Sequence, residues 1–227
     1  MILVCVRGSG FDLIPVRAEV RNGQTAVTGD SLMNASIAKN ETLLQAALTP
    51  LDFVKQVGLV VGFSLLTALS AQIVIPTGRV PITAQTFAVL LTGALLGSRL
   101  GAITMIVYLI EGASGLPFFS GGTSTLAHVM GPYGGYLIAF PAAAFVTGAF
   151  AEHGWDRRFF TAAIAMAVGS AIILFSGWLW YSFIVHTSPL LMLFDTVLKF
   201  IPGEIIKICL AAAVLPSGWK LIQKPDR

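Results

Sequence analysis

The sequence predicts an all-α membrane protein, a bundle of six transmembrane helices with an outer glycine-rich loop between the third and fourth spans. Its 227 residues are 56% hydrophobic and only 11% charged, whereas a soluble domain usually carries about 25% charged residues. From Phe53 onward, the hydrophobic residues gather into long apolar segments. The net charge of +3 comes from scattered lysines and arginines, which in a membrane protein report orientation. We therefore expect a lipid bilayer around the chain and no nucleic-acid partner.

Residues 1–50 are expected to form a cytoplasmic N-terminal tail, and residues 51–227 the transmembrane domain. The tail holds charges of both signs and lacks a long apolar run. Its first residues, "MILVCV", are too short for the core of a secretory signal. The segment fits either a small hairpin around Asn22-Gly23 or a disordered tail.

A helical span needs about 20 apolar residues, or somewhat fewer at the edge of a small bundle. The predicted spans are 53–75, 81–98, 100–115, 133–151, 159–184 and 198–215. The segment "SPLLMLFDTVLKF", residues 188–200, is expected to include a short helix at the membrane surface. The glycine-rich linker over 114–135 is tolerated at membrane depth only when protein buries it or when it lines a cavity.

The distribution of lysine and arginine predicts the orientation, because these residues favour the cytoplasmic side. A cytoplasmic N-terminus places most of them inside and leaves Arg79 and Lys199 outside. Both termini are then cytoplasmic, and the glycine-rich loop faces the exterior.

Glu204 and Lys207 lie inside the last apolar segment, "FIPGEIIKICLAAAVL". A charge in hydrocarbon costs about 2.5–3.5 kcal/mol on insertion scales, so such residues are usually paired and functional. At positions i and i+3 the two share one helix face. A carboxylate accepts and an ammonium donates hydrogen bonds, so the pair is complementary to a cyclic urea, although an anionic or zwitterionic ligand also fits. Simple neutralisation that fixes helix packing is the structural alternative.

Other polar residues give weaker signals. Glu111 is expected to be a solvated acid near the outer interface. Gln72 and Gln85 either line a cavity or bond a neighbouring helix. In the first span, Thr67 and Ala71 belong to a face of small residues that permits close contact, either within the chain or with another subunit.

Four segments together resemble the BioY family, the biotin-specific substrate-capture subunits (S-components) of energy-coupling-factor transporters. They are "VPITAQTFAVLLTGALLG" (80–97), "GLPFFSGG" (115–122), "GPYGGYLIAF" (131–140) and "IPGEIIK" (201–207). Their order and spacing both fit, over about residues 55–215.

The resemblance implies a six-helix bundle whose glycine-rich loop covers a biotin pocket near the outer surface. The acid and lysine of the family's "PGDxxK" pattern, which hold the ureido ring, fall on Glu204 and Lys207, although Asp is commoner at the first position. Thr123 stands where family members can carry an Asn near the ligand carboxylate, and Leu137 where an Arg can occur. Main-chain N–H groups of the Gly121–Ser124 turn, Gly122 among them, are expected either to replace the missing contact as an anion-binding nest or to serve loop geometry alone. The residues expected to wall the rest of the ligand are Tyr108, Tyr136, Phe118 and Phe119.

The resemblance also implies partners: a membrane coupling subunit, contacted through Thr67 and Ala71, and two cytoplasmic ATPases. The chain has no Walker sequence, so ATP would be used only by those partners. We expect a prokaryotic cytoplasmic-membrane transport subunit with no enzymatic activity, no catalytic residues and no cofactor. Its two cysteines are too few and too badly placed for a zinc site, so no metal is expected.

Two other classes remain as alternatives. "GASG", with Ser114, has the form used by rhomboid intramembrane serine proteases, but such a nucleophile needs a base, and no histidine falls within a predicted span at the required depth. An ion-coupled secondary transporter would use Glu204 as its proton carrier, yet no internal repeat typical of such folds is visible.

Overall fold

The structure is a computed structural model that describes residues 2–7, 13–21, 24–26, 42–48, 51–76 and 80–222. The chain divides into two compact units, residues 1–41 and 42–227. The predicted boundary at residue 50 is therefore too late. Residues 42–48 belong to the second unit because helix α2 (Leu43–Leu48) packs on it: Gln45 Nε2 donates a 3.3 Å hydrogen bond to the carbonyl of Leu96.

The described residues of the first unit form three antiparallel strands, β1 (Ile2–Arg7), β2 (Leu13–Arg21) and β3 (Gln24–Ala26), in the order β1-β2-β3. Arg21 is paired with Gln24. This pairing is the one that the hairpin alternative predicts, although Asn22 and Gly23 themselves lie outside the described residues.

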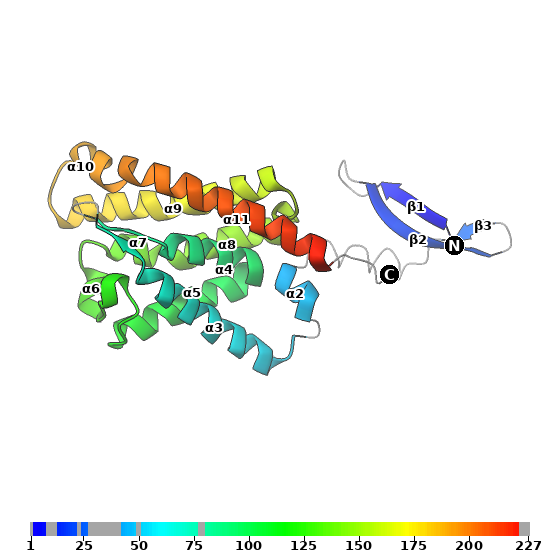
Figure 1. Ribbon diagram of the computed structural model, residues 1–227, viewed down its shortest axis with the longest axis horizontal. Coiled ribbons are helices and arrows are strands. Elements are labelled where there is room, and N and C mark those ends of the chain that lie inside the picture. The colour runs from blue at the N-terminus through cyan, green and yellow to red at the C-terminus, as the bar shows by residue number, and fades with distance from the viewer. Residues whose placement is uncertain are drawn as a thin grey trace. The chain divides into compact units, whose positions relative to one another are not determined.

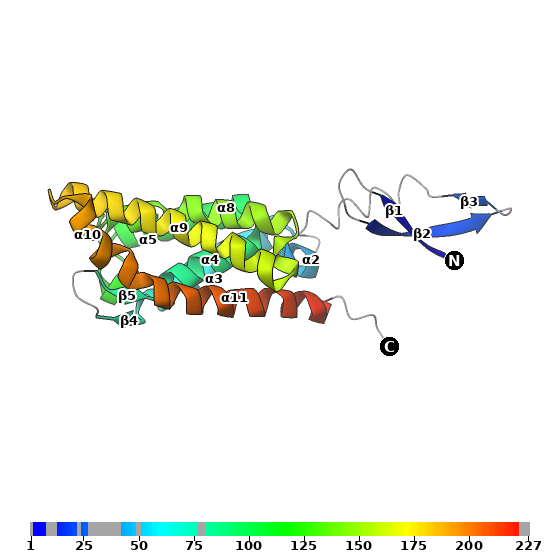
Figure 2. The same cartoon turned by 90° about the horizontal axis from the view of Figure 1, so that it is seen from above.

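The second unit is a helical bundle in which each predicted span contains helix (Figure 1). The helices are α3 (Phe53–Ala71), α4 (Gln85–Leu96), α5 (Ser98–Ala113), α7 (Gly134–Ile138) with α8 (Phe140–Glu152), α9 (Phe159–Ile184) and α11 (Ile201–Ile222). Figures 1 and 2 show α9 and α11 side by side along the bundle. Within the described part of the chain, three stretches are long and apolar enough to cross a membrane: Phe53–Ala71, Gly134–Glu152 and Phe159–Ile184.

The ends of the predicted spans differ where local structure interrupts or extends a helix. The first helix stops at Ala71 because β4 (Val74–Ile75) pairs antiparallel with β5 (Ile82–Thr83), which also delays the start of α4. Gly97 separates α4 from α5 with a φ of 88°, a conformation that favours glycine. The last helix continues to Ile222 rather than ending at residue 215.

Short connecting elements gather at the two ends of the bundle. Figure 1 places α6 (Leu126–Met130) and α10 (Pro189–Thr196) at the end opposite α2. The helix predicted within 188–200 is confirmed by α10, and Leu190, Leu191 and Phe194 on it are exposed. Among residues 80–222, 3₁₀ turns add to the connections: η1 (Ser120–Gly122), η2 (Trp155–Arg157) and η3 (Leu198–Phe200).

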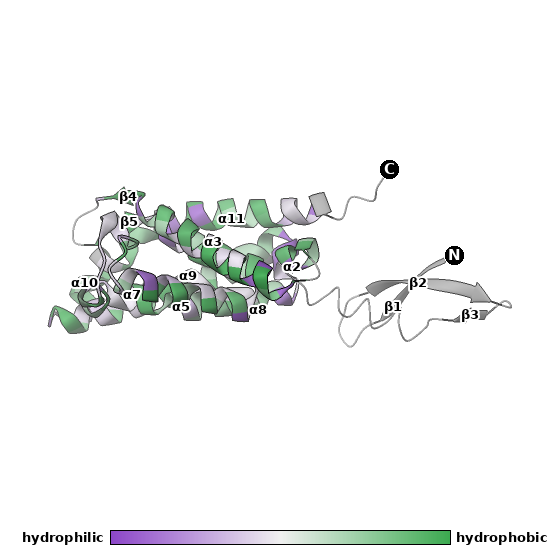
Figure 3. Cartoon of the chain, turned by 90° about the horizontal axis from the view of Figure 1, so that it is seen from below, coloured by the Kyte–Doolittle hydropathy of each residue, from purple (hydrophilic) through white to green (hydrophobic). Residues whose placement is uncertain are grey.

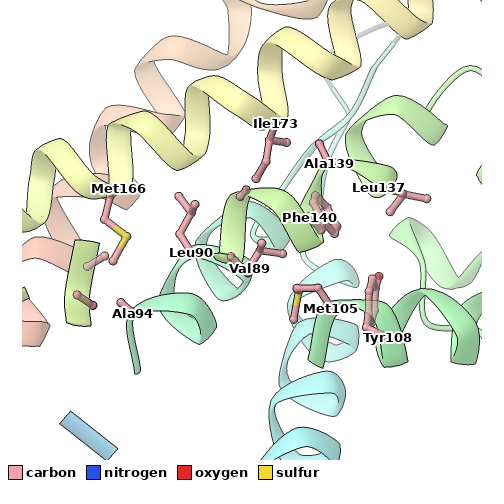
Figure 4. Packing of buried hydrophobic residues seen from close by; sticks show 14 of the residues in the cluster. Val89, Leu90, Ala94, Met105, Tyr108, Leu137, Ala139, Phe140, Met166 and Ile173 are labelled. Atoms are coloured by element: carbon pink, nitrogen blue, oxygen red, sulfur yellow. The ribbon is translucent and has the colours of Figure 1, made fainter. Parts of the chain in front are cut away.

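The core lies between α4, α5, α8 and α9. Figure 4 shows side chains from these helices converging, among them Val89, Leu90, Met105, Phe140, Met166 and Ile173. Helices α4 and α8 approach closely because Gly93 has no side chain, and a Cβ there would overlap the main chain of Ala144.

Hydrophobic residues predominate along the helices of the bundle (Figure 3), and many large apolar side chains on them are exposed. Phe160 is 79% exposed, Leu69 69% and Ile206 62%. A soluble monomer rarely exposes so much contiguous apolar surface, whereas lipid accepts it. The apolar exterior therefore agrees with a helical membrane protein.

Candidate ligand-binding pocket

A cavity of about 160 Å³ lies at the end of the bundle that carries β5 and α6. One polar group on its lining comprises Thr83, Gln85, Thr86, Glu204 and Lys207, and a second comprises Ser120, Thr123 and His128. The apolar walls include Val80, Leu137, Phe140, Leu174 and Phe200. Such a cavity, mostly apolar with a few convergent polar groups, is typical of a small-molecule site.

Glu204 and Lys207 meet at this cavity, as the sequence predicts. The Lys207 Nζ lies 2.7 Å from Glu204 Oε1, and the Glu204 residue is only 4% exposed. Helix α11 begins at Ile201, and Pro202 lies in its first turn, where proline is tolerated. Glu204 and Lys207 follow within the first two turns, at the cavity end of the helix.

Three residues from other elements complete the hydrogen bonding of this pair. Lys207 also donates to the Thr83 carbonyl at 2.7 Å and to Thr86 Oγ1 at 2.8 Å. Glu204 accepts from Thr86 Oγ1 at 2.8 Å and from Ser170 Oγ at 2.7 Å. Each charge is therefore compensated before a ligand enters, which buried charges require.

This network sets what the pocket can recognise. An ammonium has three donors, and all those of Lys207 are engaged, so a ligand carbonyl must exchange with Thr83 or Thr86. The carboxylate of Glu204 accepts three hydrogen bonds and keeps capacity for another. The network can receive a group that presents an N–H donor beside a carbonyl.

Sequence reasoning missed Thr83, Thr86 and Ser170 because each is a single small polar residue. The signal that could have found Thr86 and Ser170 is a hydroxyl inside an apolar segment, where an unbonded polar group is costly. Nothing in the local pattern says that the two hydroxyls meet the same carboxylate.

Two further predicted ligand residues, Tyr136 and Thr123, line the cavity. The Tyr136 hydroxyl donates to the Thr196 carbonyl at 2.9 Å, and its ring stacks on Phe200 with centroids 6.2 Å apart. Thr123 Oγ1 donates to the Ser120 carbonyl at 2.9 Å.

Tyr108 and Gly122 are not on the cavity lining, so the structure does not support direct ligand contact for them. Tyr108 is fully buried behind the residues that line the cavity. Its hydroxyl accepts a hydrogen bond from Gln85 and donates one to the Phe118 carbonyl. Tyr108 therefore supports Gln85, which does line the cavity. The N–H of Gly122 donates to the Phe119 carbonyl at 3.1 Å and so closes the loop rather than forming an anion nest.

The other polar positions tie the loop and helices together. Gln72 donates to the carbonyls of Pro117 and Phe119 at 3.3 Å each, which fastens the loop to the end of α3. Glu111 is half-buried and accepts a hydrogen bond from Ser64, so it links α5 to α3 rather than being simply solvated.

Thr67 and Ala71, predicted as partner contacts, are both 0% exposed. The prediction is wrong because the small-residue face of α3 turns inward, where it allows close packing against α4 and α5. Ser114, the nucleophile of the protease alternative, donates its hydroxyl proton to the Glu111 carbonyl at 2.7 Å rather than to a base.

The apolar helical bundle and the polar groups of its cavity define a multi-pass helical membrane protein with a small-molecule pocket. Sequence comparison then places it more narrowly: the sequence model of the BioY family matches residues 37–224, and the chain belongs to this family. The predicted resemblance is confirmed.

Named relatives and a solved structure agree with this assignment. The "Probable biotin transporter BioY" of Pyrococcus horikoshii is 38% identical over 70% of this chain and 93% of its own length. The "Biotin transporter BioY" of Rhizobium etli is 35% identical over 65% and 87%, respectively. The crystal structure of the S-component for biotin from an ECF-type ABC transporter superposes with a TM-score of 0.70, at 29% identity, over 76% of this chain and 95% of that one.

Proposed function

We propose that this chain binds biotin and carries it across the cytoplasmic membrane as the substrate-capture subunit of an ECF-type transporter. The observation that carries the proposal is the Glu204–Lys207 network on the wall of the pocket. The ureido ring of biotin presents N–H donors on either side of a carbonyl. The free accepting capacity of Glu204 suits the N–H groups, and the protons of Lys207 suit the carbonyl.

We further propose that the bundle crosses the membrane six times, with the pocket and the glycine-rich loop outside. The arrangement of basic residues supports this orientation. Several basic residues lie at the end of the bundle that carries α2, opposite the pocket. Arg99 is in the first turn of α5, close in the chain to Leu96, which α2 contacts through Gln45. Arg157 lies over the ring of Trp219 on α11, and Lys220 follows that tryptophan. Basic residues favour the cytoplasmic side, so the pocket opens outward and both termini are cytoplasmic.

Transport by this subunit requires energy from other chains. The sequence has no Walker motif, so a membrane coupling subunit and two cytoplasmic ATPases are proposed as partners. The exposed side of α3, with Gly58 and Gly62 open to the surroundings, is the face of this helix available to a coupling subunit.

Calorimetric titration of the purified chain tests the binding function. Biotin and desthiobiotin, which keeps the ureido ring but lacks the thiolane sulfur, should both bind with similar affinity. Absence of heat with both ligands would refute the proposal. Uptake of labelled biotin into vesicles that lack any ATPase, with and without a proton gradient, separates this function from ion-coupled secondary transport.

A further inference from the structure

The second polar group of the pocket surrounds His128, a residue that the sequence analysis did not assign to the ligand. Its ring stacks on Phe119 with centroids 5.5 Å apart and an interplanar angle of 19°, and it lies 5.9 Å from the ring of Tyr133. Its Nε2 is 3.4 Å from Thr123 Oγ1. Aromatic contacts on two sides hold the imidazole at the pocket wall, half-buried.

Biotin has two chemically different ends, a neutral ureido ring and a carboxylate. The Glu204–Lys207 network suits the first end, and the three protons of Lys207 are already donated. Among the pocket-lining residues that the structure describes, His128 is the side chain that can become positive without breaking an ion pair. Burial lowers the pKa of His128 below its ordinary value, so the empty site holds mainly the neutral imidazole at neutral pH.

We propose that His128 receives the carboxylate of the ligand and takes up one proton from solvent as the anion enters. The hydroxyl of Thr123, beside the ring, gives its proton to the Ser120 carbonyl, so it becomes a second donor to this carboxylate only by exchanging that hydrogen bond. This inference rests on the proposed function, because it concerns the other end of the same ligand.

In the part of the chain that the structure describes, the polar and charged groups that neighbour His128 supply no unpaired charge to its imidazole, so the ligand carboxylate sets its protonation state. Tyr133 lies beside the imidazole at the start of α7, and its ring packs against Tyr181 of α9 with centroids 6.3 Å apart. The charges of Glu204 and Lys207 on α11 offset each other. On α5, which packs against α6, Glu111 is engaged with Ser64, and Tyr108 is buried.

The sign of the pH dependence follows from the two states of His128. A bound carboxylate raises the imidazole pKa above that of the empty site. Affinity is therefore highest at low pH and falls as pH rises through the pKa of the complex. An aliphatic carboxyl has a pKa of about 4, so the ligand is ionised from about pH 5.5 to 8.5.

The test is calorimetric titration of the full chain with biotin and with biotinamide, in which a carboxamide replaces the carboxylate, over this pH range. Biotin affinity should fall about tenfold, the size of one charge-assisted hydrogen bond. Titrations in buffers of different ionisation enthalpy should report net proton uptake. Biotinamide should bind more weakly at low pH, with no pH dependence and no proton uptake.

His128→Phe keeps an aromatic ring between Phe119 and Tyr133 but removes both ring nitrogens. It should bind biotin more weakly at low pH and without pH dependence. His153→Phe, which changes an exposed histidine at the opposite end, is the matched control and should retain the pH profile.

Equal affinity of biotin and biotinamide at every pH, or a retained pH profile in His128→Phe, would overturn the role of His128. If His128→Phe fails to fold, the wild-type comparison of the two ligands still decides the question. Failure of both ligands to bind would instead remove the proposed function, because both carry the ureido ring.

Discussion

Ser170 of α9 donates a 2.7 Å hydrogen bond to Oε2 of Glu204 on α11, and both residues are buried. The other carboxylate oxygen accepts from Thr86 and Lys207. The carboxylate plane is therefore fixed by hydrogen bonds from three elements before a ligand arrives. Preorganised acceptors of this kind bind without the cost of ordering them.

Ser170→Ala should weaken biotin binding about tenfold, because the change leaves one buried carboxylate oxygen without its donor, a loss worth about 1–3 kcal/mol. Calorimetric titration measures the affinity. Ser217→Ala is the matched control, since Ser217 is exposed at the far end of α11 and donates only to the Ala213 carbonyl. Equal affinities in the two variants would show that Ser170 does not orient Glu204.

Lys207→Ala should weaken biotin binding by at least about 2 kcal/mol, because it leaves Glu204 buried and unpaired. It should also lower the melting temperature. The double variant Glu204→Gln/Lys207→Met removes both charges, so it should regain thermal stability and still fail to bind biotin. Wild-type affinity in Lys207→Ala would contradict the assignment of the site.

Gly177→Ala should distort the pocket wall. A Cβ at Gly177 would overlap the ring of Tyr136, which lines the cavity and is held by Thr196. The ring or α9 must shift, and overpacking of this kind typically costs about 1–3 kcal/mol. Biotin affinity should fall. Gly58→Ala, where the added methyl meets open space, should leave affinity unchanged.

Ala71→Leu should destabilise the isolated chain rather than disturb only its coupling to a partner. Ala71 is fully buried, so the larger side chain has no room between α3 and its neighbours. Thermal unfolding in detergent measures the effect. Leu69→Ala, on the exposed side of α3, should change the melting temperature little. A stable Ala71→Leu subunit that binds biotin but supports no uptake would instead restore the partner-contact prediction.

Asp156 should make stability depend on pH. It lies in η2, outside the spans, where burial raises its pKa from 3.8 to about 6, opposed by the Trp219 N–H at 2.6 Å and by Arg157. Because the folded pKa is the higher one, its contribution is most favourable below about pH 4 and is lost as pH rises to about 6. Asp156→Asn should abolish this part of the dependence of stability on pH.

The rise of the Asp156 pKa from 3.8 to about 6 corresponds to about 3 kcal/mol in the free energy of unfolding. At pH 7, Asp156→Asn should therefore melt at a higher temperature than the unmodified chain. The difference should shrink towards about pH 4, below both pKa values. Tryptophan fluorescence, to which Trp219 beside the carboxylate contributes, can follow unfolding. A constant difference at every pH would show that Asp156 does not titrate in this window.

The helical class, the approximate spans, the family and the shared helix face of Glu204 and Lys207 can all be read from the amino-acid sequence alone. These features are local: apolar length identifies a span, and residues three apart share a helix face wherever that helix lies. The four family segments are likewise readable without coordinates.

The choice of which helix faces pack against each other could be seen only in the folded chain. Thr67 and Ala71 turned out to face the interior, Tyr108 lies behind the pocket wall, and Thr83, Thr86 and Ser170 converge on one ion pair. In a membrane protein both the lipid-facing and the packed sides of a helix are apolar, so hydropathy does not distinguish them. That choice depends on contacts between residues far apart in the chain.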